Sequence, residues 1–175
     1  MTYKESLTAA MTDFGRDEKA RVLGYGVAVG NGANGTLNGV PLERRVEFPV
    51  SESLIMSAAV GMSIAGLLPL VYCERMDFMP LMLDAVLSQL DSIGRLSRGQ
   101  FKPAVIIRTM VGSSTKPPFT AITHCRDLSA GMRAMVTFPV LQLMTAADVE
   151  REYFEARQRQ KNGESTILVD YRHLM

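Results

Sequence analysis

Apolar residues recur along the chain with two different periods, and these periods predict alternating helices and strands. Between Thr2 and Gly15 the apolar side chains have helical spacing behind a Thr2–Glu5 capping-box pattern. Short apolar runs such as 104–110, rich in β-branched residues, indicate buried strands. The expected strands are 22–29, 45–48, 68–73, 104–110, 137–144 and 166–170, and the further expected helices are 51–66, 78–96 and 145–161. Residues 1–175 are therefore expected to form one domain of the α/β class, a three-layer sandwich whose mostly parallel sheet has helices on both faces.

In a fold of this class, ligands bind at the loops that follow the carboxyl ends of the strands. Three loops occupy such positions, namely 24–39, 48–52 and 111–127. The first contains Gly30 to Gly35, a glycine- and asparagine-rich run. Because no helix and no Gly-Lys-Ser/Thr follows it, a flexible or close-packed loop fits this run better than a phosphate-binding loop.

Composition narrows the class of protein. The chain has 175 residues, of which 47% are hydrophobic and 21% charged, and its net charge is +1. We therefore expect a soluble, cytoplasmic protein that binds neither nucleic acid nor membrane. Cys73 and Cys125 give no disulfide framework, and no Cys or His spacing indicates a structural zinc site. The N-terminus lacks the apolar core of a signal peptide.

Glu52 is the most informative candidate residue. It lies at the start of a helix whose following positions are small, and it could be either a helix cap or a catalytic carboxylate. Ser51 could cap the same helix by itself. His124 lies in a loop at the expected ligand-binding end of the sheet, where histidines are often functional. Phe78 could simply pack against the core at the start of its helix.

Several segments together resemble a known family. They are Met1-Thr2-Tyr3, Pro49-Val50-Ser51-Glu52, Ala65-Gly66-Leu67-Leu68-Pro69, Met76-Asp77-Phe78, Gly99-Gln100-Phe101-Lys102-Pro103-Ala104-Val105 and Thr123-His124. In this order they resemble the pyrimidine-binding domain of transketolase-like thiamine-diphosphate enzymes. The resemblance is in particular to the β subunit of the decarboxylating component of 2-oxoacid (pyruvate or branched-chain) dehydrogenases, and it covers essentially the whole chain.

The resemblance implies roles for individual residues. Glu52 would hydrogen-bond a ring nitrogen of the aminopyrimidine of thiamine diphosphate and share its proton, as a catalytic and cofactor-binding group. Phe78 would stack on the pyrimidine ring, and Ser51 would lie with them among the cofactor-binding residues. His124 would be a catalytic residue at the substrate end of the site, where it would help with proton movement or acyl transfer.

The sequence also departs from the family pattern. Tyr25 and Gly26 stand where the dehydrogenases carry an acidic pair, and 113–118 replaces their glycine-rich lead into a Gln-His-Ser-Gln run. The chain ends where the family's β subunits continue into a further domain. Most importantly, the Gly-Asp-Gly motif that holds the diphosphate and its Mg²⁺ is absent. The resemblance therefore implies that a partner chain holds Mg²⁺ and the diphosphate.

These observations predict the pyrimidine-binding subunit of a split thiamine-diphosphate enzyme. Such a subunit would act with an α-type diphosphate-binding partner and a second copy of itself, for example in a heterotetramer. It would decarboxylate a small-molecule 2-oxo acid and transfer the acyl or aldehyde fragment to an acceptor. Two alternatives stay open, namely a split transketolase that transfers a ketol unit, and a noncatalytic scaffold. The candidate loops contain few basic residues with which to hold a sugar phosphate. This scarcity argues mildly against the transketolase alternative.

Overall fold

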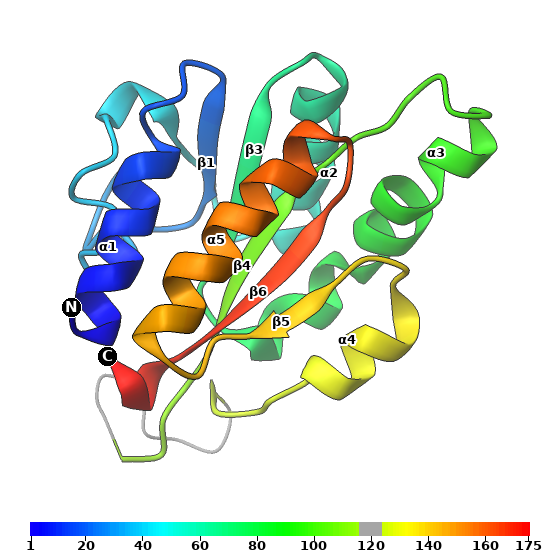
Figure 1. Ribbon diagram of the computed structural model, residues 1–175. Helices are drawn as coiled ribbons and strands as arrows, with labels where there is room; N and C mark the ends of the chain where they lie inside the picture. The colour runs from blue at the N-terminus through cyan, green and yellow to red at the C-terminus, as the bar shows by residue number, and fades with distance from the viewer. Residues whose placement is uncertain (116–123) are drawn as a thin grey trace.

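The computed structural model describes residues 1–115 and 124–175, and these residues form a six-stranded parallel sheet. The strand order is β2-β1-β3-β4-β6-β5, and every neighbouring pair is parallel. The strands are β1 (Ala20–Gly24), β2 (Arg45–Glu47), β3 (Leu68–Cys73), β4 (Ile106–Val111), β5 (Val140–Gln142) and β6 (Thr166–Tyr171). Because all strands run the same way, their carboxyl ends meet at one edge, shown at the bottom of Figure 1 for β4 and β6.

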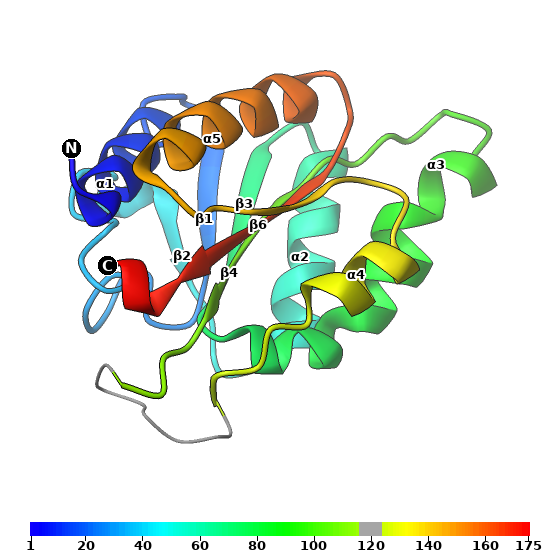
Figure 2. The same ribbon diagram turned by 60° about the horizontal axis from the view of Figure 1, so that its bottom comes forward.

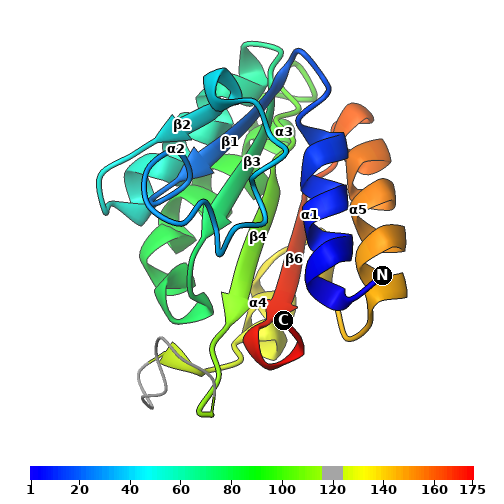
Figure 3. The ribbon, with the colours of Figure 1, turned by 90° about the vertical axis from the view of Figure 1, so that its left-hand side faces the viewer.

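Helices cover both faces of the sheet, which confirms the predicted three-layer α/β sandwich (Figures 1 and 3). The α-helices are α1 (Tyr3–Phe14), α2 (Glu52–Ile64), α3 (Ile93–Leu96), α4 (Ser129–Met135) and α5 (Ala146–Lys161). Helices α1 and α5 pack side by side on one face, and α2 lies on the other (Figure 3). Each face has its own cluster of buried apolar side chains, so the sheet is buried on both sides.

The caps predicted at Thr2 and Thr145 are present. The Thr2 hydroxyl accepts from the Glu5 N–H at 3.3 Å, and the Glu5 carboxylate accepts from the Thr2 N–H at 2.7 Å. The hydroxyl of Thr145 likewise accepts from the Asp148 N–H at 3.1 Å at the start of α5. These contacts satisfy backbone donors that have no partner within the first helical turn.

The predicted single helix over 78–96 is wrong. The chain forms a 3-10 helix (Met76–Met82), a π-helical stretch (Ala85–Asp91) and the short α3. Pro80 lies inside the first of these and can donate no backbone hydrogen bond. The hydroxyl of Ser92 also donates to the Leu87 carbonyl at 2.7 Å, five residues back. The apolar period therefore continues while the hydrogen-bonding pattern changes twice.

Other boundaries also differ from the sequence-based prediction. The strand expected over 22–29 ends at Gly24, and Val29 is exposed. The strand expected over 137–144 is shorter, covering only β5, and Pro139 precedes it. Helix α4 was not predicted, and Figure 2 shows it beneath the same face as α2. Within the described residues no helix is long and apolar enough to cross a membrane.

A buried ion pair lies between the sheet and the α1–α5 layer. Arg108 of β4 and Asp170 of β6 are both 0% exposed, and the Nε of Arg108 donates to the Asp170 carboxylate at 2.6 Å. The same guanidinium donates to the Thr36 hydroxyl at 2.8 Å and lies 5.3 Å from the centre of the Tyr72 ring. The glycine-rich loop is thereby tied to the sheet through Thr36.

Candidate active site

The candidate site is a pocket of about 220 Å³ beyond the carboxyl ends of β1 and β3. It is lined by Tyr25, Val50, Glu52, Ile55, Tyr72, Cys73, Glu74, Arg75, Phe78, Met82 and His124. Three of the four sequence-predicted site residues, Glu52, Phe78 and His124, thus surround one cavity although they are far apart in the sequence. Ser51 is not among the lining residues, and Thr123 lies outside the described residues. The chemical roles of these residues stay predictions.

Glu52 is the first residue of α2, and its side chain is partly exposed at the pocket. A carboxylate here is favoured by the positive end of the helix dipole. Ser51 occupies the N-cap position, but its side chain makes no capping hydrogen bond, so the structure does not support the alternative in which Ser51 caps this helix by itself. Burial raises the pKa of the neighbouring Cys73 thiol to about 12, and the negative charge of Glu52 adds to this effect. The Cys73 thiol is thus an uncharged lining group of the pocket beside Glu52.

Phe78 and His124 contact each other edge to face at one side of the pocket. Their ring centres are 5.6 Å apart, and the ring planes are inclined at 80°. Asp77 fixes the segment after His124, because its carboxylate accepts from the Arg126 N–H at 3.2 Å and lies 3.9 Å from the Arg126 Nε. The 3-10 helix that carries Phe78 therefore also positions the His124 segment.

Two glycines give the site its close backbone contacts. A Cβ atom at Gly112 would lie 1.7 Å from the His124 carbonyl oxygen, which leaves no room for a side chain. A Cβ atom at Gly24 would lie 2.7 Å from the Tyr72 carbonyl oxygen. These glycines were not singled out as site residues, since a sequence does not show which backbone segments approach each other.

Glu47 holds the segment from Tyr25 to Val29 at the mouth of the pocket. Its carboxylate accepts from the N–H groups of Gly26 at 2.5 Å, Ala28 at 2.7 Å and Val29 at 3.2 Å. Burial opposes ionisation of Glu47, but these backbone donors outweigh it and hold the pKa of Glu47 below its ordinary value. A carboxylate from β2 therefore lies beside Tyr25 and Gly26, two positions at which the sequence departs from the pattern that it otherwise resembles.

Arg75 is a further pocket residue that sequence reasoning missed. It is the second residue after β3 and is only 1% exposed. Its Nη1 donates to the Glu74 carbonyl at 3.1 Å and approaches the Met110 sulfur at 3.2 Å. The positive charge of Arg75 partly offsets the negative charge of Glu52 in the same pocket.

A second, basic pocket of about 500 Å³ lies around the glycine- and asparagine-rich loop. Its lining includes Lys4, Arg45 and Arg172 and no carboxylate from the described residues. Loop residues with positive φ are Gly30, Gly32, Ala33, Asn34 and Gly35. Asn34 lines this basic pocket and Tyr72 lines the Glu52 pocket. The Nδ2 of Asn34 donates to the Tyr72 hydroxyl at 3.4 Å, so this hydrogen bond connects the walls of the two pockets. Among the described residues no group of three or more His, Cys, Asp or Glu could hold a metal ion.

Sequence comparison finds relatives among the β subunits of enzymes. The β subunit of acetoin:2,6-dichlorophenolindophenol oxidoreductase from Cupriavidus necator is 28% identical over 126 residues, covering 65% of this chain and 36% of that protein. The β subunit of the pyruvate dehydrogenase E1 component from Rickettsia conorii is 28% identical over 135 residues, covering 74% of this chain and 40% of that protein. The matched regions are thus about two fifths of each relative's length. No protein-family profile matches the chain.

Solved structures with the same fold include transketolases. An inactive β4 tetramer of a split-gene transketolase superposes with a TM-score of 0.72 at 17% identity, covering 98% of this chain and 52% of the other. Transketolase from Campylobacter jejuni superposes with a TM-score of 0.74 at 15% identity, covering 98% of this chain and 26% of the other. In sequence the chain is similar to the β subunits of pyruvate dehydrogenase and acetoin oxidoreductase, and it shares its fold with part of the transketolases.

Proposed function

We propose that this chain is the pyrimidine-binding subunit of a split thiamine-diphosphate enzyme that decarboxylates a 2-oxo acid and transfers the resulting fragment to an acceptor. The observation that carries the proposal is the convergence of Glu52, Phe78 and His124 on one pocket. The homology to pyruvate dehydrogenase β subunits supports 2-oxo acids as the substrate class.

The pocket has the chemistry that an aminopyrimidine ring requires. Its walls are mostly apolar, with Ile55, Tyr72 and Met82 among them, and one carboxylate of α2 enters it. Phe78 supplies a flat aromatic surface for a planar ring. When bound, thiamine diphosphate supplies the carbanion chemistry that cleaves the bond next to a ketone.

Within this proposal Glu52 holds and shares a proton at the ring nitrogen of the pyrimidine. His124 lies on the Phe78 side of the pocket and would move a proton at the substrate. Arg75 would hold the anionic end of a substrate near this edge.

A partner chain is part of the proposal because the pocket rim is apolar and open. Tyr25 is 51% and Val50 66% exposed, and both side chains line the pocket. Exposed apolar groups around a site are typical of a surface that another chain covers. The sequence contains no Gly-Asp-Gly, so the partner would hold Mg²⁺ and the diphosphate. We propose two copies of each chain in the assembly.

The test begins with purification of the chain together with its natural partner, identified by mass spectrometry. Calorimetry should then detect thiamine diphosphate with Mg²⁺ binding to the complex but not to this chain alone. The complex should release carbon dioxide from pyruvate or a branched 2-oxo acid. Absence of cofactor binding by the complex would favour the noncatalytic scaffold and contradict the proposal.

The basic pocket favours a second candidate function, ketol transfer between phosphorylated sugars. Three cations of this pocket, Lys4, Arg45 and Arg172, are suited to hold a phosphate group. The sequence had indicated few basic residues in the candidate loops, so this pocket strengthens the transketolase alternative. Parallel assays with pyruvate and with a ketose phosphate would separate the two reactions. Charge removal by Lys4→Met and Arg172→Met should raise KM for the ketose phosphate only if this second function operates.

A further inference from the structure

An exposed basic turn projects from the molecule at the end opposite the Glu52 pocket. We call the residues Arg95, Leu96, Arg98, Phe101 and Lys102 the basic turn. They come from α3 and the segment that leads into β4, so they lie where the strands begin. Figures 1 and 2 show α3 standing out from one side of the sheet. Leu96 is 75% exposed and Phe101 46% exposed, so two large apolar side chains face solvent among three cations.

The backbone of the basic turn is held in one conformation. The Ser97 hydroxyl accepts from the Phe101 N–H at 3.1 Å and donates to the Phe101 carbonyl at 3.3 Å. The Gly99 N–H donates to the Gly94 carbonyl at 2.7 Å. Arg98 has a φ of +53°, a left-handed conformation that a non-glycine residue adopts at some cost. The exposed side chains are therefore presented from a fixed frame, as a preorganised docking surface requires.

The three cations of the basic turn have no acidic partner within the described residues. None of the ion pairs found there includes Arg95, Arg98 or Lys102. Elsewhere the described part of the chain pairs many of its arginines with carboxylates, for example Arg151 with Asp148 at 2.7 Å. Apolar and unneutralised basic side chains thus share one surface, which is complementary to an acidic partner.

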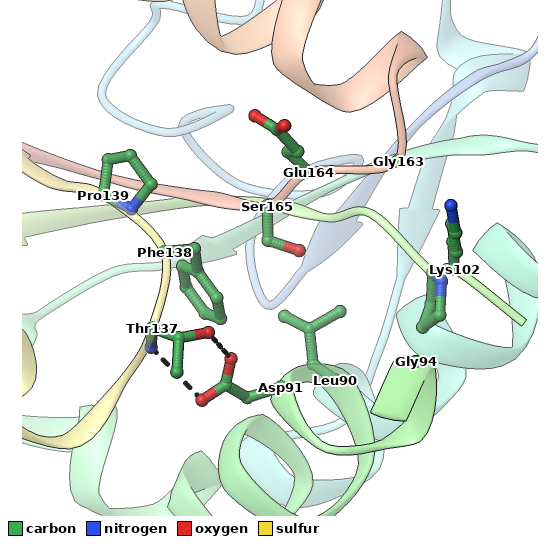
Figure 4. Close-up of a pocket in the computed structure, with 11 residues that line it drawn as sticks. Leu90, Asp91, Gly94, Lys102, Thr137, Phe138, Pro139, Gly163, Glu164 and Ser165 are labelled. Carbon is green, nitrogen blue, oxygen red and sulfur yellow. Dashed lines mark hydrogen bonds between the residues drawn. The ribbon is translucent and has the colours of Figure 1, made fainter. Parts of the chain in front are cut away.

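A cavity of about 430 Å³ adjoins the basic turn (Figure 4). Leu90, Phe138 and the hydroxyl of Ser165 converge on its centre, and Lys102 lies at its edge. The Asp91 carboxylate at one side is engaged within the chain, because it accepts from the Thr137 N–H at 3.2 Å and from the Thr137 hydroxyl. The cavity thus offers an apolar floor that could receive an uncharged side chain.

We propose that the basic turn and this cavity form a docking site for an acidic segment of a partner protein. An apolar side chain of that segment enters the cavity beside Leu90 and Phe138, and its carboxylates contact Arg95, Arg98 and Lys102. A protein segment fits better than an anionic membrane or a nucleic-acid backbone, because Leu90 and Phe138 offer an apolar floor that receives a side chain, while the cations beside it receive charge. The site is independent of the function proposed for the Glu52 pocket.

The test uses the full chain and a short fluorescein-labelled peptide of alternating Glu and Leu. Fluorescence anisotropy should detect binding that weakens with salt, and amide shifts should change at 93–103 and around the cavity. The double reversal Arg95→Glu/Arg98→Glu should weaken binding by about tenfold or more. Leu96→Ser/Phe101→Ser should weaken it as well. All four positions are exposed, so these variants should fold.

The matched control is Arg16→Glu/Lys19→Glu, which makes the same change in net charge on the exposed turn after α1. Binding of the peptide to this control should remain within about twofold of the parent chain. Equal weakening by both double reversals, or no binding to the parent chain, would overturn the proposal. Tighter binding of the parent chain to phosphatidylglycerol vesicles or to single-stranded DNA than to the peptide would also overturn it.

Discussion

Replacing Glu47 by Gln should release the segment from Gly26 to Val29 at the mouth of the Glu52 pocket. The carboxylate accepts three backbone hydrogen bonds, at 2.5, 2.7 and 3.2 Å. An amide keeps one acceptor oxygen and turns its NH₂ toward the remaining N–H groups, so at least one bond is lost and the others lose their charge. A hydrogen bond to a charged group contributes about 1.5–3 kcal/mol. Because Glu47 is only partly buried, we expect local opening to become easier by about 2–3 kcal/mol.

Amide hydrogen exchange measures this opening directly. A change of about 2–3 kcal/mol corresponds to a fall in protection of about 30- to 150-fold at Gly26, Ala28 and Val29. The matched control is Glu43→Gln, an exposed carboxylate on the neighbouring 3-10 helix (Leu42–Arg44), which should leave protection unchanged. Unchanged protection in the Glu47 variant would refute the role of this carboxylate.

The pH dependence of the same protection has a defined sign. The pKa of Glu47 in the folded chain is below its ordinary value of 4.5, so the carboxylate's contribution is complete above that value. As pH falls through the lowered pKa, protonation removes the charge and the contribution is lost. Protection factors at Gly26, Ala28 and Val29, corrected for intrinsic exchange, should therefore be constant near neutral pH and fall only in acid.

Three further substitutions test the fold around the site. Asp170→Asn leaves Arg108 charged and buried, and should lower the free energy of unfolding in urea by about 3–5 kcal/mol; a loss below about 1 kcal/mol would mean that the pair matters little. Gly112→Ala should displace the His124 backbone and shift the His124 imidazole resonances, with a loss of about 1–3 kcal/mol, whereas an unchanged spectrum would contradict the close contact. Thr2→Ala removes the α1 cap and should cost about 1 kcal/mol, measured in the same urea titration, and no loss would show that the capping box contributes nothing.

The sequence predicted those parts of the fold that depend on local signals. Helix α1 starts at its capping box, and α5 starts at the Thr145 cap, as the sequence predicted. The apolar strands β3, β4 and β6 also lie within a few residues of the predicted runs. In these places one short segment contains both the hydrogen-bonding groups and the apolar period, so neighbouring residues suffice.

Features that depend on distant contacts were missed. Arg108 and Asp170 are 62 residues apart in the sequence, and nothing local shows that their side chains meet. The role of Glu47 was also missed, because the N–H groups that its carboxylate accepts from belong to Gly26 and Ala28, in a loop distant in the sequence. The broken helix after β3 was missed because Pro80 and a π-helical stretch change the hydrogen bonds without changing the apolar period.

The candidate site lies between these cases. The sequence predicted that Glu52, Phe78 and His124 belong together through a resemblance, and parallel topology explains how residues after different strands reach one pocket. Tyr72, Cys73 and Arg75 could not be predicted as lining residues, because the register of β3 against β1 and β4 decides how far the carboxyl end of β3 reaches along the cavity. The structure therefore adds the walls of the site to the residues that the sequence indicated.

The most direct test of the central claim is the turnover of a Glu52→Gln variant in the complex with its natural partner. The amide has the shape of the carboxylate but cannot share a proton in the same way. Glu18→Gln, an exposed position remote in sequence from the pocket residues, is the matched control. We predict that the Glu52 variant still binds thiamine diphosphate with Mg²⁺ while its turnover falls by about 100-fold or more. Turnover within about twofold of the parent complex would contradict the assignment of Glu52.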